Sequence, residues 1–178
     1  MALIEKHNDY VIREALPNEF EAVGQLMVTV YSQLEGFPSP IEQPKYYKNL
    51  REIASFSKQP KVKLLVAINS DKSVLGAVVY FGDMAYYGSG GIATQEKNAS
   101  GFRLLAVDPK ARGLGIGKSL SKACINLAKL EGNSNMVIHS TKAMQIAWSM
   151  YESMGFKRSK DLDFIQDDLP VYGFRLSL

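Results

Sequence analysis

The residues from Phe102 to Leu130, FRLLAVDPKARGLGIGKSLSKACINLAKL, are the stretch that decides the fold. They open with an apolar run, Phe102 to Val107, whose length and composition are typical of a buried strand. Asp108-Pro109 ends this strand, because proline has no N–H group to donate to a neighbouring strand. A glycine-rich segment, Arg112 to Gly117, then leads into a predicted helix.

The predicted helix is amphipathic, since its apolar residues recur about every 3.6 residues and leave the lysines for solvent. The apolar positions are Ile116, Leu120, Ala123, Cys124, Leu127 and Leu130. Cys124, the single cysteine of the sequence, is therefore expected to be a small core residue rather than a nucleophile. The first N–H groups of a helix lack intrahelical partners, and glycines let an anion approach them, so the segment predicts a phosphate site.

Two common phosphate-binding patterns do not fit the glycine-rich segment. A P-loop needs glycine five residues before Gly117, and that position is Arg112. The dinucleotide pattern GxGxxG, started at Gly113, needs glycine at position 118, which is Lys118. On this segment alone, a glycine-rich turn without a ligand stays open.

The rest of the chain alternates between strand and helix patterns. We expect helices at 18–34, 44–56 and 142–154, and strands at 9–14, 61–68, 74–81, 135–140, 156–165 and 171–178. Residues 82–101 are expected to form a loop or an irregular hairpin end. This order predicts a single α/β domain, residues 9–178, with a mixed sheet and helices on both faces.

Composition restricts the class of protein further. The 178 residues carry a formal net charge of +3 and no long basic run, so the sequence does not indicate a nucleic-acid partner. It contains no apolar signal segment or membrane-spanning run, which predicts a cytoplasmic protein. No HExxH motif, cysteine pair or carboxylate cluster indicates a metal.

Two segments resemble the GNAT superfamily of acyl-CoA-dependent N-acetyltransferases. The first is Val107 to Gly117, with Arg-x-x-Gly-x-Gly, and the helix after it. The second is Ala147 to Phe156, AWSMYESMGF, which is similar to the family's A-x-x-x-Y-E-x-x-G-F segment. The resemblance covers nearly the whole chain and implies a mostly antiparallel mixed sheet with helices on both faces.

The resemblance also implies a co-substrate, acetyl-CoA, and the residues that bind it. The pantetheine arm would lie between the strands that end at Val107 and His139. Backbone groups would hold the pantetheine and the acyl carbonyl at Leu105, Ala106 and Val107, and the pyrophosphate at Arg112, Gly113, Leu114, Gly115, Ile116, Gly117 and Lys118.

Tyr151 matches the family tyrosine that protonates the leaving sulfur, while its apolar neighbours also fit a core tyrosine. Where the family often has an asparagine that contacts the cofactor, this chain has Met144. Some members carry a glutamate base near the position of Gly101, which has no side chain to serve. The remaining candidates for the general base are Glu96, Asp83, His139 or an ordered water molecule.

The functional hypothesis is acetyl transfer from acetyl-CoA to a primary amine of a small molecule or peptide, in a direct ternary complex. The alternative is a catalytically silent CoA-binding sensor or interaction module of the same fold. An acidic cluster near the C-terminus is most simply a solvated turn, although it would also attract a cationic acceptor. Its members are Asp161, Asp163, Asp167 and Asp168. The acceptor is not specified by the sequence, and a homodimer stays open.

Overall fold

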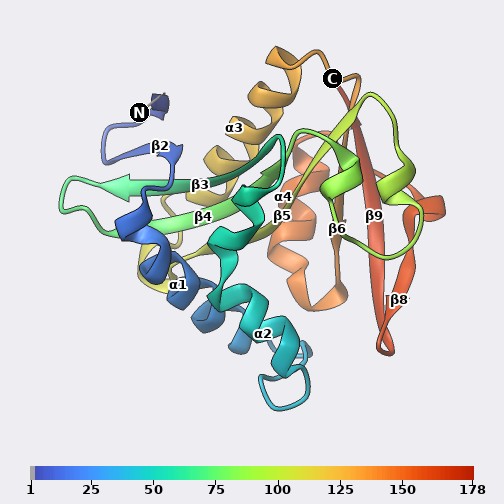
Figure 1. Cartoon of the computed structure of the whole chain (residues 1–178), viewed down its shortest axis with the longest axis horizontal. Coiled ribbons are helices and arrows are strands. Elements are labelled where there is room, and N and C mark those ends of the chain that lie inside the picture. The colour runs from blue at the N-terminus through green and yellow to red at the C-terminus, as the bar shows by residue number, and fades with distance from the viewer. Residues whose placement is uncertain (1–2) are drawn as a thin grey trace.

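The computed structural model describes residues 3–178, which form a twisted mixed sheet between two layers of helices (Figure 1). The strands lie in the order β1-β2-β3-β4-β5-β6-β9-β7, and β8 pairs with β9. Their bounds are β1 Leu3–Lys6, β2 Tyr10–Glu14, β3 Val62–Asn69, β4 Val74–Phe81, β5 Ala99–Val107, β6 Asn135–Ser140, β7 Lys157–Arg158, β8 Phe164–Gln166 and β9 Leu169–Ser177. The predicted fold class, a mixed and mostly antiparallel sheet with helices on both faces, is confirmed.

The helices divide between the two faces of the sheet. α1 (Phe20–Ser32) and α2 (Pro44–Arg51) pack on one face, and α3 (Ile116–Leu130) and α4 (Gln145–Ser153) pack on the other (Figure 1). Within β3, residues 64–68 are all apolar, and their burial explains why. Leu64 and Val66 lie in the cluster under α1 and α2, whereas Leu65 and Ala67 lie in the cluster under α3. A strand covered on both faces has no solvated side to give to polar residues.

β5 and β6 run parallel and separate part of the way along. They pair only from Ala99–Asn135 to Gly101–Val137, after which β5 stays with β4 and β6 stays with β9. A bulge accompanies the separation, since Ala77 pairs with Ala106 while Val79 pairs with Arg103. The sheet therefore opens between the C-terminal halves of its two parallel strands.

The largest difference from the sequence pattern concerns residues 156–165, which do not form one strand. They form β7, a 3-10 turn at Lys160–Leu162, and β8. The reason is a close crossing over β9, where a Cβ atom on Gly173 would lie 2.2 Å from the Cβ atom of Leu162. Asp163 fixes the crossing by accepting hydrogen bonds from the Arg158 guanidinium and from the N–H group of Gly173.

Other boundaries differ less. β1 is an additional strand, and β5 begins at Ala99 rather than Phe102. The helix expected at 44–56 ends at Arg51, and a 3-10 segment, Ile53–Lys58, follows it. In the part of the chain that the structure describes, no helix combines the length and apolar character needed to cross a bilayer.

A buried ion pair holds the start of α1 against β2. The Arg13 guanidinium donates two hydrogen bonds to the Glu19 carboxylate, at 2.8 and 2.6 Å, and their side chains are only 8% and 11% exposed. The Glu19 carboxylate also accepts a hydrogen bond from the N–H group of Leu16 at 2.8 Å. The hydrogen bond from Arg13 lowers the pKa of Glu19 below its usual range.

We expect Glu19→Ala to lower the free energy of unfolding by about 3–5 kcal/mol at pH 7, because Arg13 would remain buried without its partner. Because the pKa of Glu19 is lowered in the folded state, its contribution is complete above the unfolded pKa of about 4.3. The contribution is lost as the pH falls through the folded pKa. Urea unfolding at several pH values checks this, with the exposed Glu21→Ala as control. An equal loss of stability in both variants would contradict it.

Candidate functional site

The glycine-rich segment forms an open loop in front of α3. Gly113 and Gly115 have φ angles of +83° and +74°, and no atom lies within 4 Å of a Cβ placed on either residue. These left-handed conformations favour glycine, and Gly115 is the N-cap residue of α3. The first N–H groups of α3 therefore follow an exposed loop whose two glycines add no side chain beside the backbone, which suits an anion.

The loop lies against the end of β5 and against α4. A Cβ atom on Gly117 would lie 3.5 Å from Val107 Cγ2, 3.8 Å from Leu105 Cδ2 and 3.8 Å from Met150 Sδ. The structure thus brings the predicted pantetheine-binding strand next to the predicted pyrophosphate loop. Arg112 and Lys118 are exposed beside the loop, so both basic side chains are free to reach an anion bound there.

The backbone of β5 from Leu105 to Val107 lies beyond the last residue pair with β6. On the β6 side, the N–H and C=O groups of this segment therefore have no strand partner within the described residues. Tyr31 of α1 is a further contact that sequence reasoning missed, since its hydroxyl donates a hydrogen bond to the Leu105 carbonyl at 3.2 Å. This contact ties α1 to the strand edge that is expected to hold the acyl group.

Tyr151 lies on α4 in the core cluster that also holds Phe102 and Ile116, and it is 5% exposed. Its ring packs against Phe102 and Phe156 with centroid distances of 5.7 and 5.9 Å. Burial raises the pKa of Tyr151 far above its usual range, so the hydroxyl is protonated at neutral pH. Its position on the same face as the glycine loop is compatible with a proton donor and also with packing.

His139 has partners for both ring nitrogens. Nε2 lies 2.9 Å from the Leu162 carbonyl oxygen and is its donor, so Nδ1 accepts from the Tyr87 hydroxyl at 3.1 Å. Burial lowers the pKa of His139, which keeps the ring neutral at pH 7. The Tyr87 ring also fills the space beside Gly101, where an added Cβ would lie 2.7 Å from Tyr87 Cε2. A side chain at position 101 would therefore collide with Tyr87.

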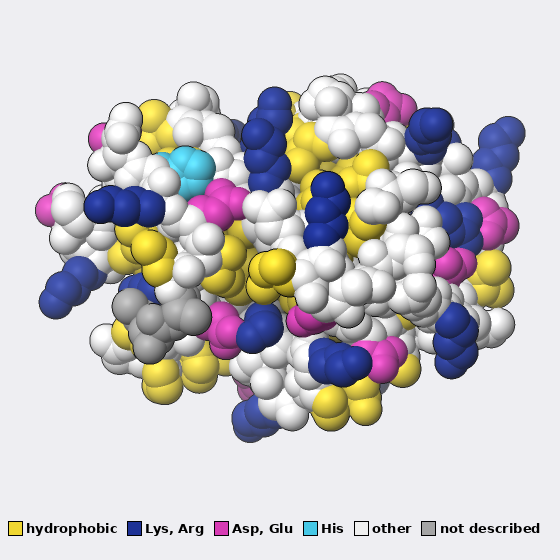
Figure 2. Space-filling view, turned by 90° about the horizontal axis from the view of Figure 1, so that it is seen from above, with side chains coloured by type: hydrophobic (Ala, Val, Ile, Leu, Met, Phe, Trp, Pro, Cys, Tyr) yellow, Lys and Arg dark blue, Asp and Glu magenta, His cyan; other side chains and the backbone are white. Residues whose placement is uncertain are grey.

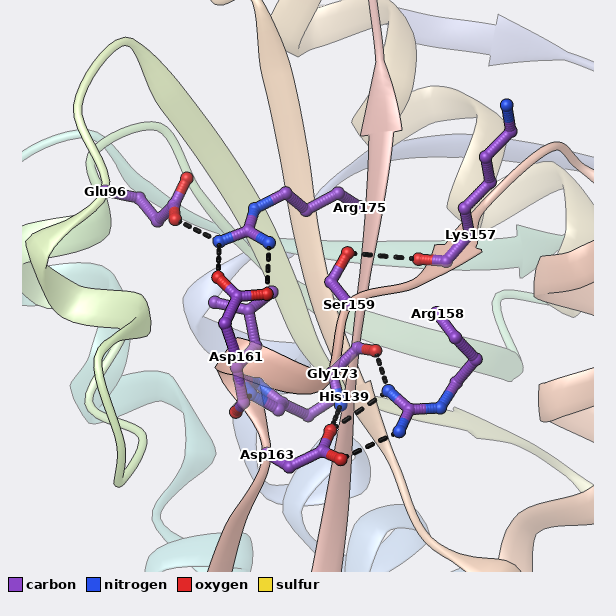
Figure 3. Close-up of polar contacts among 10 residues, drawn as sticks. Glu96, His139, Lys157, Arg158, Ser159, Asp161, Asp163, Gly173 and Arg175 are labelled. Atoms are coloured by element: carbon purple, nitrogen blue, oxygen red, sulfur yellow. Dashed lines mark hydrogen bonds and ion pairs between the residues drawn. The ribbon is translucent and has the colours of Figure 1, made fainter.

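The carboxylate candidates for the base are also engaged elsewhere. Glu96 pairs with Arg175, which pairs with Asp161 as well (Figure 3). Asp83 accepts a hydrogen bond from the N–H group of Ala85 at 2.9 Å and so caps a 3-10 turn. Neither carboxylate is a residue that lines the pocket at the open end of β5 and β6. The acidic cluster is also divided, since Asp163 pairs with Arg158 (Figure 3).

A pocket lies where β5 and β6 separate, on the face covered by α1 and α2. Its lining residues include Tyr31, Tyr46, Arg103, His139, Met144 and Phe164. Apart from His139 and Met144, these residues were not predicted as site residues from the sequence. One signal was present, because Arg103 is the single charged residue within the apolar run of β5.

Charged surface residues are mixed in sign on the face seen from above, where α3 lies. Lys and Arg side chains are spread over this face, with Asp and Glu among them (Figure 2). Within residues 3–178, no group of three or more His, Cys, Asp or Glu side chains is arranged to hold a metal ion.

Comparison with known sequences decides the family. The model of the acetyltransferase (GNAT) family matches residues 27–156, which include the glycine loop, the separated strands and Tyr151. The chain belongs to the GNAT acetyltransferase family. A curated relative, the N-acetylaspartate synthetase of Xenopus tropicalis, is 32% identical over 102 residues. The match covers 57% of this chain but only 33% of that GNAT relative's length.

Solved GNAT structures share the fold over almost the whole chain. A GCN5-related N-acetyltransferase from Kribbella flavida superposes with a TM-score of 0.72 at 17% identity, covering 96% of this chain and 98% of that one. An acetyltransferase from Salmonella typhimurium, solved with its cofactor acetyl-CoA, gives a TM-score of 0.66 at 16% identity. That superposition covers 96% of this chain and 95% of the Salmonella protein.

Proposed function

We propose that this GNAT protein transfers an acetyl group from acetyl-CoA to a primary amine of a small molecule or peptide, in a direct ternary complex. One observation carries the proposal. The gap between β5 and β6 has the glycine loop and Tyr151 on the side of α3 and α4, and it has a pocket on the side of α1 and α2. A ligand held at the loop and an acceptor in the pocket would meet through this gap.

The residues fit acetyl-CoA in three places. The first N–H groups of α3, from Ile116 to Lys118, would hold the pyrophosphate, with positive charge added by Arg112 and Lys118. The backbone edge at Leu105–Val107, which has no strand partner on its β6 side, would hold the pantetheine arm and the acyl carbonyl. When bound, acetyl-CoA supplies an acetyl thioester, and Tyr151 would donate a hydrogen bond or a proton to the departing sulfur.

Proton removal from the amine is assigned to water, since the three side-chain candidates are already engaged. Glu96 is in an ion pair, Asp83 caps a turn, and His139 uses both ring nitrogens. The acceptor would then lose one proton in solution and enter as the neutral amine. After its nitrogen attacks the thioester, that nitrogen would lose a further proton to solvent through the open pocket. This assignment predicts that the rate rises with pH as the ammonium form of the unbound acceptor is converted to the neutral amine. It predicts no plateau at the pKa of an enzyme histidine.

The comparisons support this reading at the level of the family. The relatives include a protein named for making N-acetylaspartate, so a small amine that carries acidic groups is acetylated by a relative of this chain. The engaged base candidates favour a second function, a CoA-binding module without transferase activity.

Release of free thiol from acetyl-CoA, measured with a panel of primary amines, separates the two functions. Amine-dependent thiol release with stoichiometric N-acetyl product is expected. CoA binding without thiol release from any amine would instead establish the silent module. Absence of CoA binding would contradict both functions.

A further inference from the structure

The pocket on the α1–α2 side of the gap contains a basic group within aromatic walls. Apolar surface comes from Tyr31, Tyr46 and Phe164. The side chain of Arg103, a residue of β5, is part of the same lining. Of the residues that line it, Asp167 is the single carboxylate, and it lies on an exposed turn where it accepts a hydrogen bond from Gln43 at 3.1 Å. Arg103 is therefore the single Lys or Arg side chain of the lining, and the one carboxylate there is solvated.

Arg103 has no acidic partner in the described chain. Its guanidinium donates one hydrogen bond, to the Tyr87 carbonyl at 2.7 Å, and lies 5.4 Å from the centroid of the Tyr87 ring. By contrast, Arg13, Arg158 and Arg175 each pair with a carboxylate. A half-buried guanidinium has five N–H donors, and most of those on Arg103 remain available to a ligand.

Two largely buried polar residues also belong to the lining of this pocket. Ser140 and Thr141 line it, and they are only 2% and 4% exposed. Neither hydroxyl has a hydrogen-bond partner among residues 3–178. Both oxygen atoms are shielded from the pocket surface, so Arg103 is the charged donor that a ligand in the pocket can reach.

We propose that the acceptor is a small amine that carries a carboxylate, of the amino-acid kind, and that Arg103 binds this carboxylate. This proposal rests on the proposed function and specifies its acceptor. A planar guanidinium recognises a carboxylate through paired hydrogen bonds, and that of Arg103 has donors to spare. The opposite preference, for a polycation, lacks support in the pocket, because Asp161 and Asp163 are paired with arginines and Asp167 is solvated.

The test compares α-amino acids with their own amides, which keep the amine and replace the carboxylate. Alanine, phenylalanine and aspartate and their α-amides serve as the pairs, and kcat/KM is measured by thiol release. We expect wild type to prefer the acid, and Arg103→Gln to reduce that preference by about 10- to 100-fold, the value of a hydrogen bond to a charged group. The kcat/KM for the amides is expected to fall much less than the kcat/KM for the acids.

Arg51→Gln is the matched control, since it removes an exposed arginine of α2 that lines neither pocket, and it should keep the preference. Equal use of acids and amides by wild type would overturn the proposal, as would a folded Arg103→Gln that still prefers acids.

If Arg103→Gln does not fold, Arg103→Lys replaces it, and an unchanged preference there would contradict paired recognition. If no amine is acetylated, the proposed function fails, and calorimetric binding of the same pairs to the CoA-saturated protein still tests the pocket. Equal binding of acid and amide would overturn the proposal in that case.

Discussion

Tyr151→Phe is expected to lower kcat for acetyl transfer by ~10²–10⁴-fold, the usual contribution of a general acid, while CoA affinity changes little. The substitution keeps the ring, which packs against Phe102 and Phe156, and removes only the oxygen. Burial raises the pKa of Tyr151, so the wild-type hydroxyl carries its proton at neutral pH. A hydrogen bond from it would stabilise the charge that develops on the sulfur, whether or not the proton crosses completely.

Steady-state kinetics and CoA binding on the same preparation check this expectation. Tyr80→Phe is a suitable control, since Tyr80 lies in the same core cluster and donates a hydrogen bond to Glu131 at 2.8 Å. That variant should lose stability, by about 1–3 kcal/mol for a hydrogen bond to a charged group, and keep kcat. An unchanged kcat in Tyr151→Phe would assign Tyr151 to packing alone.

Gly117→Val is expected to weaken CoA binding by about 10- to 100-fold, the equivalent of one lost hydrogen bond to a charged group. An added Cβ makes ordinary contacts with Val107, Leu105 and Met150, so the protein should fold. The side chain would occupy space between the end of β5 and α4, beside the N–H groups proposed to hold the pyrophosphate. Calorimetric titration with CoA and a thermal melt give both quantities. A folded variant with wild-type affinity would refute the assignment of the loop.

Gly115 and Gly132 provide a second, matched comparison. Both have positive φ angles, +74° and +76°, and nothing lies within 4 Å of an added Cβ on either. Alanine at each position therefore carries a similar backbone cost, about 1 kcal/mol. Only Gly115→Ala should reduce CoA affinity, because Gly132 follows α3 at its far end. An equal effect on affinity would show that backbone strain, and not contact with the ligand, is responsible.

The parts of the fold that were predictable from the sequence depend on local pattern. The strand at β5, the glycine loop and α3 follow from an apolar run, a proline and a helical period, all within 29 residues of sequence, Phe102 to Leu130. The burial of Cys124 followed in the same way, since it lies on the apolar face of α3. The break in 156–165 was not predictable, because it results from Leu162 crossing over Gly173, a contact between separate elements.

The acceptor side of the site was less accessible to sequence reasoning for the same reason. Its Phe and Tyr residues come from α1, the segment after α1, α2 and β8, and each by itself resembles an ordinary core residue. The partners of His139 are Tyr87 and Leu162, which lie 52 and 23 residues away in the chain. Arg103 carries a signal in the sequence that was not used, a charge within a buried strand. Its availability to a ligand is visible only in the structure, where no carboxylate of the described chain pairs with it.

The crossing of Leu162 over Gly173 separates the support of the C-terminal hairpin from its tip. Leu162 and Asp163 fasten the hairpin to β9, while Phe164 and the turn at Asp167 lie beyond these fastenings and line the pocket. The turn itself needs only two residues, Asp167 and Asp168, both in the left-handed conformation. Residues 164–169 therefore constitute an exchangeable segment. Grafting a different tip between the same anchors should alter which amines are accepted and leave the cofactor loop untouched.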